Sequence, residues 1–187
     1  MKNKTRTIII AVLIAVFLGV ATNIAHAKFE FSARIGYFEP NDNYFESFYK
    51  KGLIYGVYGG WIHAKGVGVQ AGADLYFNNF RYNEREHSVL LSSTTVSCIY
   101  VPLQNEIATP IFGVGWGWYH LSDYSMFNAK KYSNNSLGYH AVGGVRFNIY
   151  KGLFSDLQIK YSYSRSETIS NINVGGWTST LGVGYSF

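Results

Sequence analysis

The chain has 187 residues, with 16 basic and 11 acidic side chains, one cysteine and an aromatic content of 18%. A single cysteine excludes an internal disulfide, and because no basic tract follows residue 27, the charge does not indicate a nucleic-acid-binding protein. Abundant Tyr and Phe, 20 glycines and three prolines are typical of a chain with many strands, in which glycine relieves crowding and aromatic residues meet a lipid boundary.

The first 27 residues have the pattern of a secretory signal peptide. Three basic residues precede an apolar run from Ile8 to Val20, and an A-x-A cleavage site ends at Ala27. The alternative is an uncleaved anchor, but the run falls short of the roughly 20 apolar residues that a membrane-spanning helix needs. We therefore predict a signal peptide over 1–27 and one domain over 28–187, which retains 13 basic and 11 acidic residues.

Eight later segments alternate apolar and polar residues with the period of two that gives a strand two different faces. Each is close to the length of a tilted membrane-spanning strand, about 9–11 residues. In the last segment, Trp177, Leu181 and Tyr185 lie on one face of the predicted strand, and Thr180 and Gly182 lie on the other. In chain order, the predicted strands cover residues 29–38, 53–64, 67–78, 95–106, 111–121, 139–149, 153–165 and 177–187.

The alternation also predicts which side chains face outward. The facing of the second strand stays open, because three glycines blur its pattern. The fourth strand is the least regular, since Pro102 cannot donate to a ladder and requires a bulge. For that strand the pattern places Ile99, Val101 and Leu103 outward.

The connections alternate between short and long. Short ones fall at 64–66, 107–110 and 150–152, and long ones at 39–52, 79–93, 122–138 and 166–173. Short periplasmic turns, long extracellular loops and two periplasmic termini are typical of outer-membrane barrels. We therefore predict an all-β fold, an eight-stranded antiparallel up-and-down transmembrane β-barrel. The alternative is a soluble lipocalin-like barrel or β-sandwich with its apolar face turned inward.

The end of the chain resembles the C-terminal targeting signal of bacterial outer-membrane β-barrels, which reads polar-x-Gly-x-x-aromatic-x-aromatic. Thr180, Gly182, Tyr185 and Phe187 occupy its fixed positions. The resemblance implies that the barrel-assembly machinery recognises this strand and that the protein resides in a bacterial outer membrane.

Three further stretches support this resemblance: R-I-G-Y-F-E-P-N-D at 34–42, G-V-G-W-G-W-Y at 113–119 and K-G-L-F-S-D-L-Q-I-K-Y-S-Y at 151–163. With the last strand they resemble the small outer-membrane β-barrel superfamily of OmpW-like, OmpX-like and opacity-type porin-family proteins. The resemblance implies a Gram-negative structural protein, an adhesin, a narrow channel for small hydrophobic solutes or a lipid A-modifying enzyme. Fold alone does not choose between these functions.

Seven charged side chains are predicted to face the lumen. They are Glu30, Arg34, Asp74, Glu106, Arg146, Asp156 and Lys160. Charges in so narrow a space must be paired or hydrated, and the interior of an eight-stranded barrel can be filled by side chains. We therefore predict an ion-pair network that plugs the lumen. A gated path for protons or solutes is the alternative.

His120 and Ser122 form an H-x-S pair. If Trp116 and Trp118 face lipid, parity places the pair on the outer wall, level with the outer leaflet. The pair resembles that of the outer-membrane lipid A deacylases, and the resemblance implies that histidine activates serine as a nucleophile. No Glu occurs between Asp123 and Lys160 to orient the histidine, so the favoured interpretation is an interfacial histidine beside an aromatic belt.

Six aromatic residues are predicted to form girdles at the level of the lipid headgroups. They are Trp61, Trp116, Trp118, Trp177, Tyr185 and Phe187. His63, His87 and His140 lack metal-ligand spacing, so neither a metal nor a cofactor is predicted.

The predicted function is non-enzymatic: a barrel with a structural or surface-interaction role through its extracellular loops. Lys50 and Lys51 lie beside aromatic residues in the first long loop, and such side chains bind lipopolysaccharide phosphates or the surface of a partner or host protein. The first alternative is a narrow channel for small hydrophobic solutes, which needs a lateral gap near Pro102 or the second strand. The second alternative is a lipid A-modifying enzyme.

Overall fold

The computed structural model describes residues 27–42, 46, 50–82, 85–102, 107–125, 131–165 and 173–187, and the structural statements below concern these residues. Residues 1–26 of the predicted signal peptide lie outside this part. The strands are β1 (Ala27–Pro40), β2 (Gly52–His63), β3 (Val67–Tyr82), β4 (Arg85–Tyr100), β5 (Ala108–Ser125), β6 (Lys131–Tyr150), β7 (Leu153–Ser164) and β8 (Gly176–Ser186).

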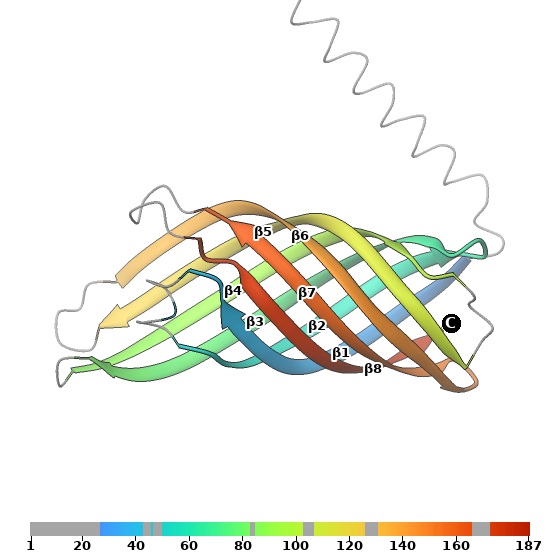
Figure 1. Ribbon diagram of the computed structural model, residues 1–187, viewed down its shortest axis with the longest axis horizontal. Coiled ribbons are helices and arrows are strands. Elements are labelled where there is room, and N and C mark those ends of the chain that lie inside the picture. Colours follow the sequence, from blue (N-terminus) through green and yellow to red (C-terminus); the bar gives the residue numbers. More distant parts are fainter. Residues whose placement is uncertain are drawn as a thin grey trace, which may run out of the picture.

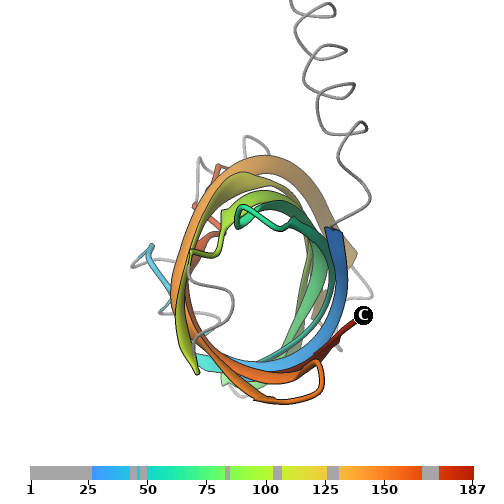
Figure 2. The same cartoon turned by 90° about the vertical axis from the view of Figure 1, so that its right-hand side faces the viewer.

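These strands form one closed antiparallel barrel in which each strand pairs with its neighbours in sequence (Figure 1). β8 closes the ring against β1, from the pair Glu30–Ser186 to the pair Pro40–Gly176, and Figure 2 shows this ring from one end. The predicted eight-stranded up-and-down barrel is confirmed. Among the described residues, no helix has the length and apolar character needed to cross a bilayer.

The outer wall of the barrel is apolar. On β1, the side chains of Phe29, Phe31, Ile35 and Tyr37 are 48–58% exposed, whereas the alternating Arg34 is 5% exposed. Rows of outward apolar side chains on β3 and β8 are similarly exposed, and from first to last each row advances eight to ten residues along its strand. At about 3.3 Å per residue and a tilt of about 40°, these rows span roughly 20–25 Å, close to the apolar band of outer-membrane barrels. A soluble barrel would bury this surface, so the lipocalin-like alternative is wrong.

The prediction for the fourth strand is wrong in both range and facing. β4 begins ten residues earlier than predicted and ends at Tyr100, so Pro102 follows the strand and no bulge is needed. Ile99 and Val101 are 3% and 1% exposed and point into the lumen. The alternation misled because the lumen is apolar at this end of the barrel. Leu103 lies outside the described residues.

Two of the predicted long loops, 79–93 and 122–138, are largely strand. β3 and β4 remain paired up to Tyr82 and Arg85, and β5 and β6 up to Tyr124 and Lys131. At this end of the barrel the inward side chains include apolar ones, such as Val89 and Leu91, so the apolar-out, polar-in alternation stops before the ladder does. The period-of-two criterion therefore detects the lipid-facing part of each strand and misses its extension.

The facing of β2, which the sequence left open, is settled by its neighbours. Ile54, Tyr58 and Ile62 point into the lumen, and Tyr55 and Val57 face outward. β2 pairs with β1 along its whole length and with β3 from Ile54 to Ile62.

Candidate functional site

Six of the seven charged residues predicted to face the lumen form three ion pairs across it. The pairs are Arg146–Glu30, Arg34–Asp156 and Lys160–Asp74. β1 contributes Glu30 and Arg34 to the first two pairs, and β7 contributes Asp156 and Lys160 to the last two. The two residues on each strand are four positions apart, so successive pairs are separated by about 13 Å along the strand. The seventh residue, Glu106, lies outside the described residues.

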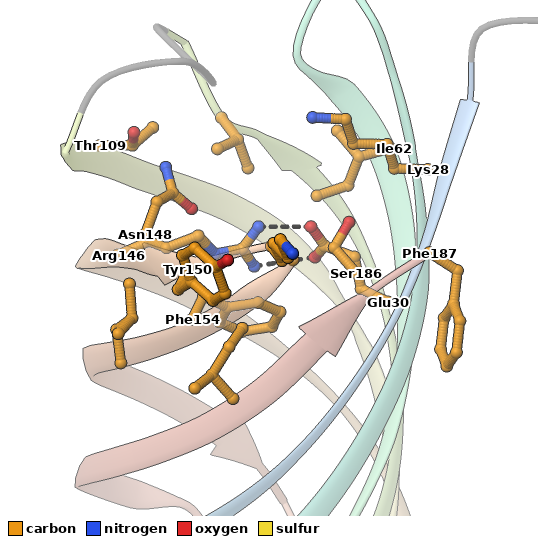
Figure 3. A pocket seen from close by; sticks show the side chains of 15 residues that line it. Lys28, Glu30, Ile62, Thr109, Arg146, Asn148, Tyr150, Phe154, Ser186 and Phe187 are labelled. Atoms are coloured by element: carbon orange, nitrogen blue, oxygen red, sulfur yellow. Dashed lines mark hydrogen bonds and ion pairs between the residues drawn. The ribbon is translucent and has the colours of Figure 1, made fainter.

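The pair nearest Ala27 and Phe187 is bidentate (Figure 3). Arg146 donates from Nη1 to Glu30 Oε1 at 2.5 Å and from Nη2 to Oε2 at 2.8 Å. The guanidinium carbon also lies 4.0 Å from the ring centroid of Phe154. Two parallel charge-assisted hydrogen bonds and a cation–π contact hold both side chains in one geometry.

The middle pair is also bidentate. Arg34 donates from Nε to Asp156 Oδ1 at 3.1 Å and from Nη2 to Oδ2 at 3.0 Å. Gln158 Nε2 donates to the same carboxylate at 3.2 Å. The guanidinium of Arg34 lies 4.0 Å from the ring centroid of Tyr58.

The third pair is connected to the second through Tyr58. Lys160 Nζ and the Tyr58 hydroxyl both donate to the carboxylate of Asp74, which also accepts from Ser93 Oγ at 3.2 Å. The side chains of Lys160 and Asp74 are 11% and 3% exposed. Three donors around one buried carboxylate compensate its loss of hydration.

Glycines make room for this network, Gly72 and Gly182 among them. A Cβ atom on Gly72 would lie 2.2 Å from the ring of Tyr58, and a Cβ atom on Gly182 would lie 2.6 Å from the carboxylate of Asp156. Both strands can therefore pass the network only without side chains at these positions.

Apolar clusters lie on both sides of the polar middle. The apolar cap, at the end away from the termini, comprises Phe38, Ile54, Tyr76, Val89, Leu91, Tyr119, Leu121 and Val174. A smaller cluster near the termini comprises Ile62, Ile99, Val101 and Ile111. The lumen therefore changes from apolar to charged and back to apolar along its axis.

The cavities along the lumen differ greatly in size. At the end of the barrel where β1 begins and β8 ends, a cavity of about 430 Å³, here called the terminal cup, is lined by Lys28, Glu30, Arg146, Lys151 and other residues (Figure 3). Deeper in the lumen, a cavity beside Arg34 and one beside Asp74 each measure about 10 Å³, which is the room of a single water molecule.

On the outer wall, a hydrogen-bonded chain joins three polar side chains. Ser122 Oγ lies 2.9 Å from His120 Nε2, and His120 Nδ1 lies 2.6 Å from the Asn135 side-chain oxygen. Asn135 stands directly opposite His120 in the β5–β6 register. The adjacent outward residues Trp118 and Leu137 are 57% and 70% exposed, so the trio begins where the apolar band ends. Ser122 itself is 2% exposed.

The predicted girdle residues occupy the outer wall. Trp61 is half-buried, and Trp116, Trp118, Trp177, Tyr185 and Phe187 are 44–76% exposed. Their contact with lipid headgroups stays a prediction.

In the targeting signal, the side chains of Tyr185 and Phe187 lie outward and Thr180 points inward beside Gly182. Recognition of this strand by the assembly machinery stays a prediction. Within the described part of the chain, no group of three or more His, Cys, Asp or Glu side chains is arranged to hold a metal ion.

Sequence reasoning missed Tyr58 in the lumen and Asn135 on the wall. The alternation of its strand places Gln158 inward but does not predict its hydrogen bond to Asp156, and the glycines of β2 obscure the facing of Tyr58. Asn135 was assigned to a long loop, although extension of the two strands would have paired it with His120.

Comparison with solved structures identifies the fold. No protein-family model matches the sequence, and no curated protein matches it. Solved structures match over nearly the whole chain. Neisserial surface protein A is 16% identical, covers 86% of this chain and 97% of its own, and has a TM-score of 0.65. OprG from Pseudomonas aeruginosa is 12% identical over 87% and 96% of the two chains, with a TM-score of 0.64.

A third similar structure is Ail of Yersinia pestis in complex with the heparin analogue sucrose octasulfate. It is 15% identical, covers 87% of this chain and 99% of its own, and has a TM-score of 0.59. The chain has the fold of the small bacterial outer-membrane β-barrels. Together with the exposed apolar band, this fold supports the predicted outer-membrane location.

Proposed function

We propose that this protein is an integral outer-membrane barrel with a closed lumen, whose function lies in presenting its extracellular side to lipopolysaccharide or to a surface partner. The observation that carries the proposal is the series of three buried ion pairs between two apolar clusters. Cavities of about 10 Å³ beside the inner two pairs leave room for water molecules one at a time.

The ladders favour this role over a narrow channel for hydrophobic solutes. Such a channel needs a gap in the wall, and the two places expected from the sequence offer none. β2 is paired on both sides, and Pro102 lies in the connection after β4. Side chains that are paired by charge and packed against rings also resist the passage of an apolar solute.

The extracellular side is proposed as the interaction surface because the outer wall faces lipid and the middle of the lumen is filled by packed side chains. Ail, which shares the fold, holds an anionic sugar analogue. In this chain, Lys51 pairs with Glu39 and, at 3.4 Å, with Glu46 at the same end of the barrel. Lys50 is exposed beside it, and its ammonium can meet a phosphate or sulfate group.

Single-channel recording in planar bilayers tests the closed lumen. The wild-type barrel is expected to give no conductance steps, and the variant Arg34→Ala/Asp156→Ala is expected to give small ones because it empties the middle of the lumen. If the wild type instead gives defined conductance steps, and added hydrophobic solutes block them, the protein is a channel.

A second candidate function is ester hydrolysis at the outer wall. Asn135 accepts the Nδ1 proton of His120 in the proposed arrangement, which leaves Nε2 free to take the proton of Ser122. The Ser122 oxygen would then attack an acyl ester of an outer-leaflet lipid, and the lipid alcohol would leave with the proton that His120 had taken. In a second step His120 would activate water to release the acyl group from Ser122. The burial of Ser122 ranks this function second, since neighbouring side chains must move before an ester reaches it.

Lipid A profiles from cells that carry the wild type or Ser122→Ala test the hydrolase. A deacylated species present only with the wild type would establish it, and Asn135→Asp should increase that species because a carboxylate stabilises the imidazolium better than an amide does. Identical profiles for all three proteins would exclude this activity.

A further inference from the structure

The terminal cup contains buried hydrogen-bond donors that the fold leaves unused. Arg146 is 4% exposed, and its Nε atom has no hydrogen-bond partner among the described residues. The buried Ser186 hydroxyl also lines the cup and likewise has no partner among these residues. Buried polar groups are usually paired, so two unpaired groups in one cavity indicate that something else supplies the acceptors.

The cup also has an excess of positive charge. Both carboxylate oxygens of Glu30 accept hydrogen bonds from Arg146, which balances that pair. Lys28 and Lys151 line the same cavity, and no ion pair is found for either ammonium within the described part of the chain. A ligand that balances this charge must be an anion.

The backbone at Lys151 is strained. Lys151 and Gly152 form the two-residue turn between β6 and β7, with φ angles of 44° and 87°. Such turns favour Asn or Gly at both positions, since other side chains rarely adopt positive φ. Lys151 is therefore a poor residue for the turn but a suitable one for the cup, because it places an ammonium at its rim. Strained residues of this kind concentrate at binding sites.

We propose that the terminal cup binds a small organic anion through a carboxylate or phosphate group. The anionic group contacts Lys151 and Lys28 at the rim, and a small shift of the lining side chains lets it also accept from the buried Arg146 Nε and Ser186 Oγ. The body of the ligand packs on Tyr150, whose exposed ring forms part of the wall (Figure 3). A volume of about 430 Å³ lies within the usual range of small-molecule sites, roughly 300–1,000 Å³.

Calorimetric titration of the full chain, exported by cells and purified in a zwitterionic detergent, tests this site. The probes are glucose 6-phosphate, glucuronate and glucose, which have similar bodies and differ in their anionic group. Binding of at least one of the two anions, without binding of glucose, is expected. Preference for one anion identifies the group that the cup selects. Equal heats for glucose and both anions, or no heat from any of them, would overturn the proposal.

Two matched variants assign the binding to the cup. Lys151→Asn removes one ammonium while it installs a residue that the turn prefers, so the barrel should remain folded and the affinity for the anion should fall roughly tenfold. Lys65→Asn removes the same charge from the exposed β2–β3 turn, outside the cup, and should leave the affinity unchanged. An anion that binds the two variants and the wild type equally well would show that the cup is not its site.

Discussion

The two faces of the same eight strands are organised by different rules. On the outer wall, apolar side chains face lipid and touch only near neighbours, as Tyr161 touches Trp177 on the adjacent strand with 4.9 Å between ring centroids. In the lumen, each charge depends on one partner from a distant part of the chain, as Arg34 depends on Asp156, 122 positions away. The outer wall should therefore tolerate changes of size, whereas the lumen should not tolerate the loss of one partner.

The largest expected effect comes from breaking a buried ion pair. Arg34→Ala leaves the Asp156 carboxylate buried without its partner, which costs about 3–5 kcal/mol. The temperature at which the barrel loses its fast mobility on unboiled gels should fall sharply. Leu181→Ala, on the lipid face of the adjacent strand, should lower it much less. The reverse order of the two variants would contradict the proposed difference between the faces.

A charge on the outer wall should destabilise the barrel nearly as much. Leu181 is 55% exposed near the middle of its strand, and arginine at the bilayer midplane costs about 2–4 kcal/mol in such barrels. Urea unfolding of Leu181→Arg in lipid vesicles measures this cost, and the same variant in detergent should lose less. Equal stability of Leu181→Arg and wild type in vesicles would mean that this face does not meet lipid.

A smaller effect is expected when a methyl group is added to the lumen. Gly72→Ala places Cβ 2.2 Å from the ring of Tyr58, and overpacking of this kind costs about 1–3 kcal/mol. Gly143→Ala is the matched control, because a Cβ atom there meets nothing within 4 Å, and it should be neutral or slightly stabilising. Urea unfolding compares the two, and similar losses of stability would show that the lumen is less tightly filled than described.

The smallest effect is expected at the exposed ion pairs beyond the apolar band. The hydrogen bond that Lys51 donates to Glu39, and the charges of Glu39 and Glu46, raise the pKa of Lys51 above its usual 10.5. A raised pKa means that any stability from these pairs is complete below about pH 10.5 and is lost as the pH rises through the folded-state value. The difference in stability between wild type and Lys51→Ala should be small at pH 8 and vanish at high pH. A difference that grows with pH would contradict this sign.

The sequence predicted the outer wall better than the lumen for a physical reason. Lipid imposes the same demand on every outward position, so alternation alone located the rows on β1, β3 and β8. The lumen is apolar at its ends and charged in its middle, so Ile99 and Val101 have inward positions that the alternation assigned to lipid. The charged residues were recognised because charges cannot face lipid, but their pairing depends on register across the barrel.

The hydrogen-bonded group of Ser122, His120 and Asn135 on the outer wall was also only partly predictable from the sequence. His120 and Ser122 were recognised as a pair from their spacing on one strand, whereas Asn135 belongs to the next strand. Its place beside His120 follows from a ladder that continues beyond the apolar band. Single-strand patterns carry no information about such cross-strand neighbours.

The most direct test of the closed lumen is the reactivity of single cysteines placed along it. In a Cys98→Ser background, Asn148→Cys lies in the terminal cup and Thr180→Cys lies deeper, beside a cavity of about 10 Å³. With the barrel in vesicles and a small water-soluble thiol reagent on both sides, Asn148→Cys should react quickly and Thr180→Cys should react only after unfolding. Equally fast reaction at both positions would show that water and solutes pass the ion pairs, and the lumen would have to be described as a channel.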